Sequence, residues 1–483
     1  MVPINRKFIA AAAAFALSAA FAQENAAPEQ TAAGQKVTLT VQEAVDFALE
    51  NSRTLKTADI DLEIKARAGK NAWNVLLPDV TATGTLNRSK DSLYGNYLSS
   101  AWQQANMGSN HVPVEAVEPR LGLEDNESSH WTGRISLSVD WNLSLAYIYQ
   151  IRSSKANYEI GKITYDQSIQ DLKVNVQKLF YGLLLQQESL GIQEASLENA
   201  RKRAVQAETN YRNGLVPELS MLQAQVTYEN LRPDVEKAQR ELRQQFDTFA
   251  FLLGLPVGTE LTLSGTIEPV FVEADVDSLI AKYGENSLDL QSLDKNLDVL
   301  KMNLTALNLS TYTPFLKLGY AWTPTLGGYA LDGSNWSDFP NDGYWKDQGS
   351  FSITVGWNLT NLLPFSANRQ QAKDLQANIS KLEINRENLL ENQKMQVREA
   401  VDKLTEARQQ IDAMGRNISL AQRSYDMTVR SYNNGRTELL DVRDAENQLE
   451  QAKLGLANQK FNYISALLDL ESILNTNLIS AGE

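Results

Sequence analysis

Two stretches of the chain, YRNGLVPELSMLQAQ at Tyr211–Gln225 and YNNGRTELLDVRDAE at Tyr432–Glu446, share one pattern. Each has a tyrosine, then Asn-Gly, then a helix-like pattern with an alanine ten residues beyond the glycine. Asn-Gly between strands predicts a strand hairpin, but here both pairs interrupt segments patterned as very long helices. A glycine after the last helical residue supplies the left-handed backbone that ends a helix. We therefore expect helical hairpins with tips near 214 and near 435.

The segments that lead to these tips are too long for an ordinary globular domain. Residues 143–214 contain no proline, and 60 to 70 helical residues at about 1.5 Å each would span on the order of 100 Å. In the second segment, mostly apolar residues recur at steps of three and four from Val397 to Tyr432. The corresponding positions of the first segment run from Val176 to Tyr211. A pattern sustained over five heptads favours a coiled coil over an ordinary core stripe.

The two halves of the chain follow one plan. VQEAVDFALENS at Val41–Ser52 aligns without gaps with VDSLIAKYGENS at Val276–Ser287, an offset of 235 in the numbering. SVDWNLS at Ser138–Ser144 matches TVGWNLT at Thr354–Thr360 at an offset of 216, and the offset between the tip glycines is 221. Landmarks in the same order predict an internal two-fold repeat. The expected organisation is a first repeat at 23–254, a second repeat with an equatorial segment at 255–475, and a C-terminal tail at 476–483.

Each repeat contains two segments in which apolar and polar side chains alternate. Residues 134–143 and 351–360 alternate without error, and weaker patterns lie around 80–87 and 315–323. Such alternation over about ten residues suits a membrane β-strand with its apolar face toward lipid. A soluble sheet with one buried face fits the alternation equally well.

The segments that join these strands, together with the N-terminal residues described below, favour membrane strands over a soluble sheet. Residues 87–131 and 323–349 are rich in Gly, Asn, Ser and aromatic residues, which is typical of exposed loops on the outer face of a membrane barrel. A sheet in lipid must close, because an open edge leaves backbone groups unpaired in hydrocarbon. Membrane barrels need about eight strands or more. Four strands per chain therefore predict that several chains share one barrel.

The first residues, MVPINRKFIAAAAAFALSAAFAQ, have the layout of a secretory signal peptide. Arg6 and Lys7 are basic, an alanine-rich apolar run follows, and Ala20 and Ala22 are small residues typical of a cleavage site. A membrane anchor is the alternative, but the run is shorter than the roughly 20 residues that a spanning helix needs. We expect residues 1–22 to be removed and the protein to be exported.

The composition excludes several classes of function. The 483 residues carry a formal net charge of −14, whereas nucleic-acid binding needs a basic surface. The chain has no cysteine, which excludes disulfides and thiolate chemistry. Its two histidines, His111 and His130, fall in one predicted loop, and neither a Gly-rich phosphate loop nor a Ser/His/Asp motif occurs. We expect no catalytic residues, no metal, no cofactor and no nucleic-acid partner.

Taken together, these features resemble the TolC-type outer-membrane efflux proteins. The resemblance rests on LTVQEAVDFALENS at Leu39–Ser52, on Leu77-Pro78 before a strand, on the duplicated halves, and on LLDVRDAE after the second tip. It covers nearly the whole mature chain. It implies a mixed α/β membrane protein, a homotrimer whose four strands per chain make a 12-stranded β-barrel in outer-membrane lipid. A long α-helical coiled-coil barrel would continue it through the periplasm.

The resemblance also implies a function. The protein would be the outer-membrane channel of a tripartite efflux or type I secretion system, a passive conduit that extends into the periplasm and is gated at its helical tips. A periplasmic adaptor (membrane fusion) protein and an inner-membrane pump of the RND, ABC or MFS type would open it by docking. The alternative is a non-conducting periplasmic coiled-coil spacer or envelope structural protein, which explains the heptads but not the four amphipathic strands.

The resemblance assigns roles to the tips by position. The adaptor-docking residues would be Gly214, Leu215, Gly435, Arg436 and Thr437. The periplasmic gate would contain Asp441 and Asp444 as acidic rings, with Tyr432 and Arg443 beside them. The residues alone leave other roles open: both aspartates could stabilise the helix dipole, Tyr432 could simply pack at the end of the heptads, and Arg443 could pair with the aspartates.

The two tips differ in charge. Where the second tip has Asp441 and Asp444, the first has Ser220 and Gln223. We therefore expect the second copy to carry most of the charge of the gate.

Overall fold

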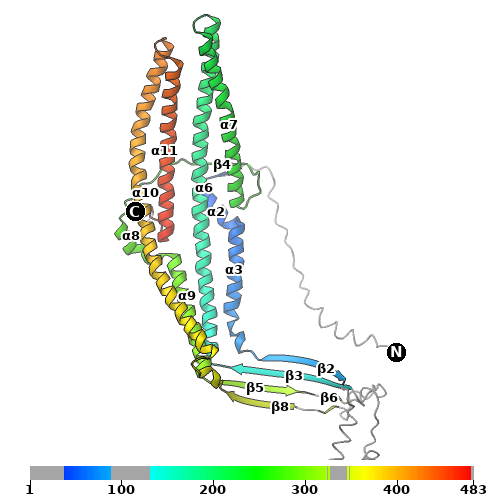
Figure 1. The fold of residues 1–483 in the computed structure, drawn as a ribbon. Coiled ribbons are helices and arrows are strands. Elements are labelled where there is room, and N and C mark those ends of the chain that lie inside the picture. Colours follow the sequence, from blue (N-terminus) through cyan, green and yellow to red (C-terminus); the bar gives the residue numbers. More distant parts are fainter. Residues whose placement is uncertain (1–36, 89–130, 324, 327–344, 347–348, 480–483) are drawn as a thin grey trace, which may run out of the picture.

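The computed structural model describes residues 37–88, 131–323, 325–326, 345–346 and 349–479. The signal peptide expected at 1–22, both histidines and most of the two predicted loops lie outside these residues. Within them the fold is mostly helical, with a small sheet at one end of an elongated group of helices (Figure 1). No helix among the described residues is both long and apolar enough to cross a membrane.

Two helices of 67 residues each, α6 (Ala146–Arg212) and α10 (Ala367–Asn433), dominate the molecule. At about 1.5 Å per residue each is on the order of 100 Å long, which confirms the predicted length. After α6 the chain reverses at the first tip and continues as α7 (Glu218–Leu252). After α10 it reverses at the second tip and continues as α11 (Leu439–Leu474). Both hairpins point away from the sheet (Figure 1).

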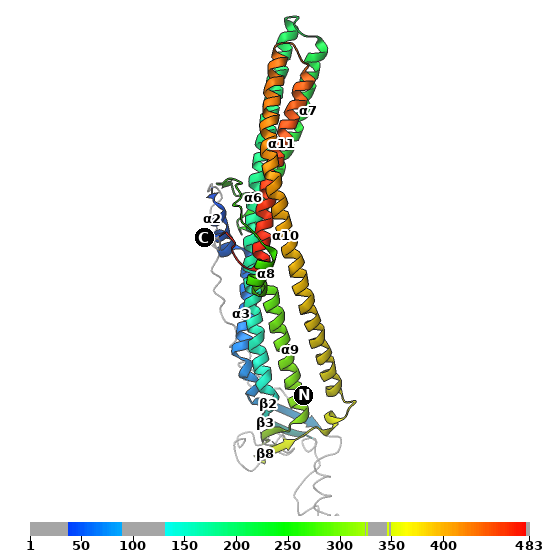
Figure 2. The same cartoon turned by 90° about the vertical axis from the view of Figure 1, so that its left-hand side faces the viewer.

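Shorter helices continue α7 and α11 toward the sheet. α3 (Arg53–Lys70) follows the line of α7, and α9 (Leu288–Tyr312) follows the line of α11 (Figure 1). Figure 2 shows α3, α6, α9 and α10 side by side in the half of the molecule nearer the sheet. The short helices α2 (Val41–Asn51) and α8 (Val276–Tyr283) lie at the level of the junctions.

The two junctions are built alike. After α7, Gly254 has a φ of +83°, and a Cβ there would lie 2.3 Å from the Asn51 carbonyl oxygen at the end of α2. After α11, Asn475 has a φ of +46°, and its side-chain amide donates to the Asn286 carbonyl oxygen at 3.4 Å. A short parallel pair, β1 (Val37–Leu39) with β4 (Leu261–Leu263), lies beside the first junction.

The main sheet contains the four predicted strands. They are β2 (Asp79–Arg88), β3 (Trp131–Leu143), β5 (Phe315–Trp322) and β8 (Gly349–Gly356), antiparallel in the order β2-β3-β5-β8. The two-residue strands β6 (Thr325–Leu326) and β7 (Trp345–Lys346) extend its rim. In the described part of the chain, β2 pairs only with β3 and β8 only with β5. One chain therefore forms a sheet with two open edges and no closed barrel.

The last strand is shorter than the prediction of 351–360. β8 ends at Gly356, opposite Phe315, the first residue of β5. The residue before Phe315 is Pro314, which has no N–H for a ladder hydrogen bond. Beyond Gly356 the chain turns into a 3-10 helix at Leu359–Leu362, and the Trp357 indole donates to the Thr311 carbonyl oxygen at 3.1 Å.

The core lies along the helices. One cluster packs α2 and α7 against α6 around Val176, Phe180 and Leu183, and another packs α8 and α11 against α10 around Val397 and Leu404. Toward the first tip the buried positions narrow to alanines, Ala200, Ala204 and Ala207. All of these residues except Phe180 belong to the predicted heptads, whose register is therefore confirmed at those positions. At Phe180 the structure buries the residue next to the predicted position, and Leu179 is half-buried. Tyr211, the last heptad position of the first hairpin, is exposed rather than packed.

Candidate gate and docking tips

Both tips end their first helix with the same turn. Gly214 and Gly435 each have a φ of +71°, and a Cβ on either would meet open space, so the left-handed backbone alone favours glycine there. At the first tip the amides of Gly214 and Leu215 donate to carbonyls of the last helical turn at 2.9 and 2.8 Å. At the second tip the amides of Gly435 and Arg436 do the same, each at 2.9 Å. This pair of bonds is the Schellman motif, in which the glycine reverses the chain and satisfies the last carbonyls.

The predicted docking residues are accessible in the single chain. Gly214, Leu215, Gly435 and Arg436 are exposed, and 71% of the Leu215 surface is open to solvent. Thr437 is half-buried, and its hydroxyl has no hydrogen-bond partner among the described residues. Each tip therefore presents a backbone turn. The turn of the first tip carries the apolar side chain of Leu215, and the turn of the second tip carries the basic side chain of Arg436.

The two return helices begin differently. α7 follows Pro217, which provides no side-chain cap. α11 begins with a capping box, in which the Glu438 amide donates to the Asp441 carboxylate at 3.2 Å and the Glu438 side chain accepts from the Asp441 amide. Asp441 thus satisfies an amide that the helix leaves unpaired, and it places negative charge where the helix dipole favours it.

The other predicted gate residues lie close to this cap. Asp441, Arg443 and Asp444 are exposed, and Tyr432 is half-buried at the end of α10. Within the described chain no ion pair joins Arg443 to either aspartate. In the single chain Arg443 is therefore not paired with either carboxylate, and the Asp441 carboxylate is engaged in the cap of α11.

A buried polar cluster next to the tips was not predicted. Arg203 of α6 forms an ion pair with Glu446 of α11, and the Asn199 side-chain amide donates to the same carboxylate at 3.0 Å. Glu446 is only 7% exposed. Burial raises the pKa of the neighbouring Glu450 carboxyl, and the charge of Glu446 raises it further. Burial likewise raises the pKa of the Tyr425 phenol beside the pair. This cluster ties the first hairpin to the second.

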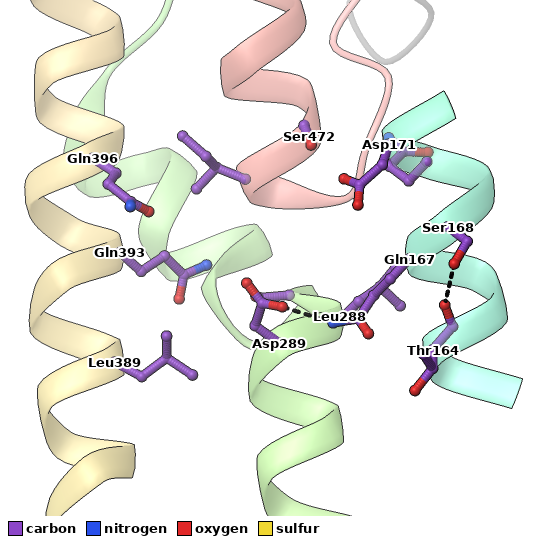
Figure 3. A pocket seen from close by; sticks show the side chains of 13 residues that line it. Thr164, Gln167, Ser168, Asp171, Leu288, Asp289, Leu389, Gln393, Gln396 and Ser472 are labelled. Carbon is purple, nitrogen blue, oxygen red and sulfur yellow. Dashed lines mark hydrogen bonds between the residues drawn. The ribbon is translucent and has the colours of Figure 1, made fainter. Parts of the chain in front are cut away.

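One polar hollow lies farther from the tips, at the junction of α9 and α11 (Figure 3). Its volume is about 420 Å³, and its wall includes Asp171, Asp289 and Gln393. The Gln167 side-chain amide donates to Asp289 at 2.6 Å, while the buried amide nitrogen of Gln393 has no partner among the described residues. The described residues include no group of three or more His, Cys, Asp or Glu that could hold a metal ion.

Comparisons with known proteins assign this arrangement to a family. The family model described as "Outer membrane efflux protein" matches residues 44–255 and 319–476, which include both tips and most of the helical part. The chain belongs to this family. The predicted resemblance is thus confirmed, and the keywords transport, efflux, outer membrane and channel apply at the level of the family.

Individual members of the outer membrane efflux protein family are distant relatives. Nodulation protein T of Rhizobium leguminosarum bv. trifolii is 22% identical over 386 residues, which cover 77% of each chain. Outer membrane protein TolC of Escherichia coli (strain K12) is 24% identical over 326 residues, covering 66% of this chain and 64% of TolC. The crystal structure of the Campylobacter jejuni CmeC outer membrane channel superposes with a TM-score of 0.70 at 16% identity, covering 90% of this chain and 85% of CmeC. This structural likeness establishes the fold.

Proposed function

We propose that this chain is the outer-membrane channel of a tripartite efflux or type I secretion system. The observation that carries the proposal is the division of the chain into two ends. One end is an open-edged sheet with apolar side chains exposed on β2 and β8, and the other is a pair of accessible tips on the order of 100 Å away. Membership of the efflux family supports a conduit between these ends.

The open edges support a homotrimer. Exposed apolar residues such as Val80, Ile353 and Val355 suit contact with lipid. Between neighbouring strands the alternate residues are polar, as in the ion pair of Asp140 with Lys317 at 3.0 Å. Because a sheet in lipid must close, three copies with four strands each would form a 12-stranded barrel in the outer membrane. The long helices would continue it into the periplasm as a coiled-coil barrel.

An internal two-fold repeat explains why the chain has two tips. The tip offset of 221 relates the bounds of α6 to those of α10, and it relates the first residue of α7 to the first residue of α11. The indole of Trp141 donates to the Leu76 carbonyl oxygen at 2.6 Å, as the indole of Trp357 does to Thr311. These correspondences support repeats at 23–254 and 255–475. A trimer would then carry six hairpins around its axis.

The tips would form the gate. Three copies of Asp441 and Asp444 would surround the axis with carboxylates that attract cations, and Tyr432 and Arg443 would lie beside them. The exposed turns at Gly214, Leu215, Gly435, Arg436 and Thr437 would receive a periplasmic adaptor linked to an inner-membrane pump. The conduit itself would be passive, without enzymatic activity or a cofactor.

Planar-bilayer recordings of the purified full-length protein test this assignment. We expect Asp441→Asn combined with Asp444→Asn to weaken block by multivalent cations and to alter cation selectivity, because the ring loses its charge. The matched control is Asp59→Asn with Asp61→Asn, which removes two exposed charges from α3. Unchanged block and selectivity in the tip variant would contradict the gate assignment.

Fractionation separates the channel from the spacer. A channel is expected in the outer-membrane fraction, extractable only with detergent, and migrating as a heat-modifiable trimer. A protein that is released without detergent would contradict the channel and favour a periplasmic spacer.

A further inference from the structure

The polar hollow at the junction of α9 and α11 has the size of a small-molecule site (Figure 3). Its volume of about 420 Å³ falls within the roughly 300–1,000 Å³ that such sites span. Most of its wall comes from four helices of one chain, α6, α9, α10 and α11. The hollow therefore exists without a second copy, and what it binds does not depend on the homotrimer proposed above.

The α10 side of the hollow contains a buried hydrogen-bond donor without a partner. Gln393 is 7% exposed, and its amide nitrogen makes no hydrogen bond within the described part of the chain. Figure 3 shows this side chain pointing from α10 toward Asp289 of α9. Because an unpaired buried donor destabilises the folded chain, this position favours a ligand that supplies an acceptor oxygen.

The other sides of the hollow carry two carboxylates. Asp171 of α6 has no hydrogen bond or ion pair with any described residue, and its carboxylate points into the hollow (Figure 3). Asp289 is the second residue of α9, where the helix dipole favours a charged carboxylate. Its Oδ1 accepts from the Gln167 side-chain amide at 2.6 Å, which leaves Oδ2 for a ligand. The hollow therefore presents negative charge and several acceptor oxygens.

No basic side chain balances this charge within the wall. Among the described residues that line the hollow, none is a lysine, an arginine or a histidine. Two turns along α6, Lys178 pairs with Asp469 at 2.5 Å, and two turns back along α10, Arg386 pairs with Asp294 at 2.6 Å. These two basic side chains are engaged outside the wall, so the hollow favours a cation.

We propose that the polar hollow binds a small hydroxylated amine of the size of an amino sugar. The protonated amine would bind the carboxylates of Asp171 and Asp289 through charge-assisted hydrogen bonds. A hydroxyl or ring oxygen of the same molecule would accept from the Gln393 amide. The Ser168 hydroxyl already donates to the Thr164 carbonyl oxygen, so it offers its lone pairs to the remaining hydroxyl groups of the ligand.

Other ligands match this wall less well. The described residues include no group of three or more His, Cys, Asp or Glu that could hold a metal ion, and the Gln393 donor would stay unpaired beside a metal. A polyamine likewise brings no acceptor to Gln393. A neutral sugar or a water molecule pairs with Gln393 but brings no positive charge to Asp171 and Asp289.

Calorimetric titration of the full-length protein, in a detergent without a sugar headgroup, tests the proposal with glucosamine as the probe. We expect saturable binding at one site per chain. Glucose, which lacks the amine, and putrescine, which lacks an oxygen, are each expected to bind at least about tenfold more weakly. No saturable binding of glucosamine would overturn the proposal. Equal binding of glucose or putrescine, or displacement of glucosamine by an equal concentration of Mg²⁺, would overturn the assigned ligand class.

Asp171→Asn places the ligand in the hollow. We expect this variant to bind glucosamine at least about tenfold more weakly, because the amine loses a charged partner. Asp166→Asn is the matched control, since it removes an exposed carboxylate of the same helix outside the wall, and its affinity is expected to be unchanged. Equal affinities in the two variants would show that glucosamine binds elsewhere and would overturn the site.

Gln393→Leu tests the buried donor. We expect it to weaken glucosamine binding about fivefold, through the loss of one hydrogen bond. Its thermal unfolding midpoint is expected to be no lower than that of the wild type, because the change removes an unpaired buried amide. A variant with unchanged affinity would show that an ordered water only occupies this part of the hollow, which would overturn the role of Gln393. Bilayer recordings and fractionation test the channel separately from all these outcomes.

Discussion

At the scale of residues, the buried cluster of Arg203, Glu446 and Glu450 makes the stability of the contact between the two hairpins depend on pH. The pKa of the Glu450 carboxyl is raised, first by burial and then by the charge of Glu446, while Ser196 opposes the shift with a hydrogen bond. The folded state therefore holds a proton at pH values where the unfolded state has lost it. The free energy of unfolding should then rise as pH falls through this raised pKa toward the ordinary pKa of a glutamate.

Glu450→Gln isolates this contribution. We expect the variant to be more stable than the wild type near neutral pH, and the difference should vanish at about pH 4, where the carboxyl is largely protonated in both states. Urea unfolding in detergent at several pH values measures it, with Glu387→Gln on an exposed part of α10 as control. A stability difference that does not change with pH would show that the charge of Glu450 is not responsible.

Local sequence patterns predicted the two tips but not the buried cluster of Arg203, Glu446 and Glu450. Asn-Gly at the end of a long helical segment requires a left-handed residue, so Gly214 and Gly435 could be placed from local sequence. Glu446 is visible in the sequence as a charge within the buried positions Val442, Ala445 and Leu449 of α11. Its partner Arg203 lies 243 residues away, and no local period connects the two.

At the scale of elements, the end of a helix depends on what it meets. Gly254 and Gly214 both have left-handed backbone, but a Cβ at Gly254 would lie 2.3 Å from the Asn51 carbonyl oxygen, whereas a Cβ at Gly214 meets open space. We expect Gly214→Ala to lower the free energy of unfolding by about 1 kcal/mol from backbone strain alone. Gly254→Ala should cost clearly more, because α7 must also move away from α2.

Thermal unfolding of the two glycine variants, side by side in detergent, measures this difference. Gly254→Ala is expected to have the lower midpoint. Equal midpoints would contradict the close approach of the helix ends at the first junction.

Periodicity fixed the type of each main element but not every boundary. The alternation at 351–360 predicted a strand through Thr360, yet β8 ends at Gly356 because its neighbour begins after a proline. The heptads predicted the buried side of α10, and Leu420 and Met427 on another side of the helix are exposed. The pairing of β8 with β5, rather than the local alternation, decides where the strand ends.

At the scale of the whole molecule, one chain leaves both edges of its main sheet unpaired within the described residues. The four strands, the long helices and the family were all accessible from sequence, because each leaves a periodic or duplicated pattern. The closure of the barrel was inferred from the need to pair the edges of β2 and β8 in lipid. Nothing within a single chain supplies those partners in the described residues, so closure rests on the proposed assembly.

Cryo-electron microscopy of the full-length protein in lipid nanodiscs tests the trimeric conduit most directly. The account predicts three-fold symmetry, twelve strands closed around one axis within the bilayer, and helical hairpins on the order of 100 Å long that end in a ring of tips. A particle with one chain, or a sheet whose β2 and β8 edges remain unpaired in the bilayer, would contradict it.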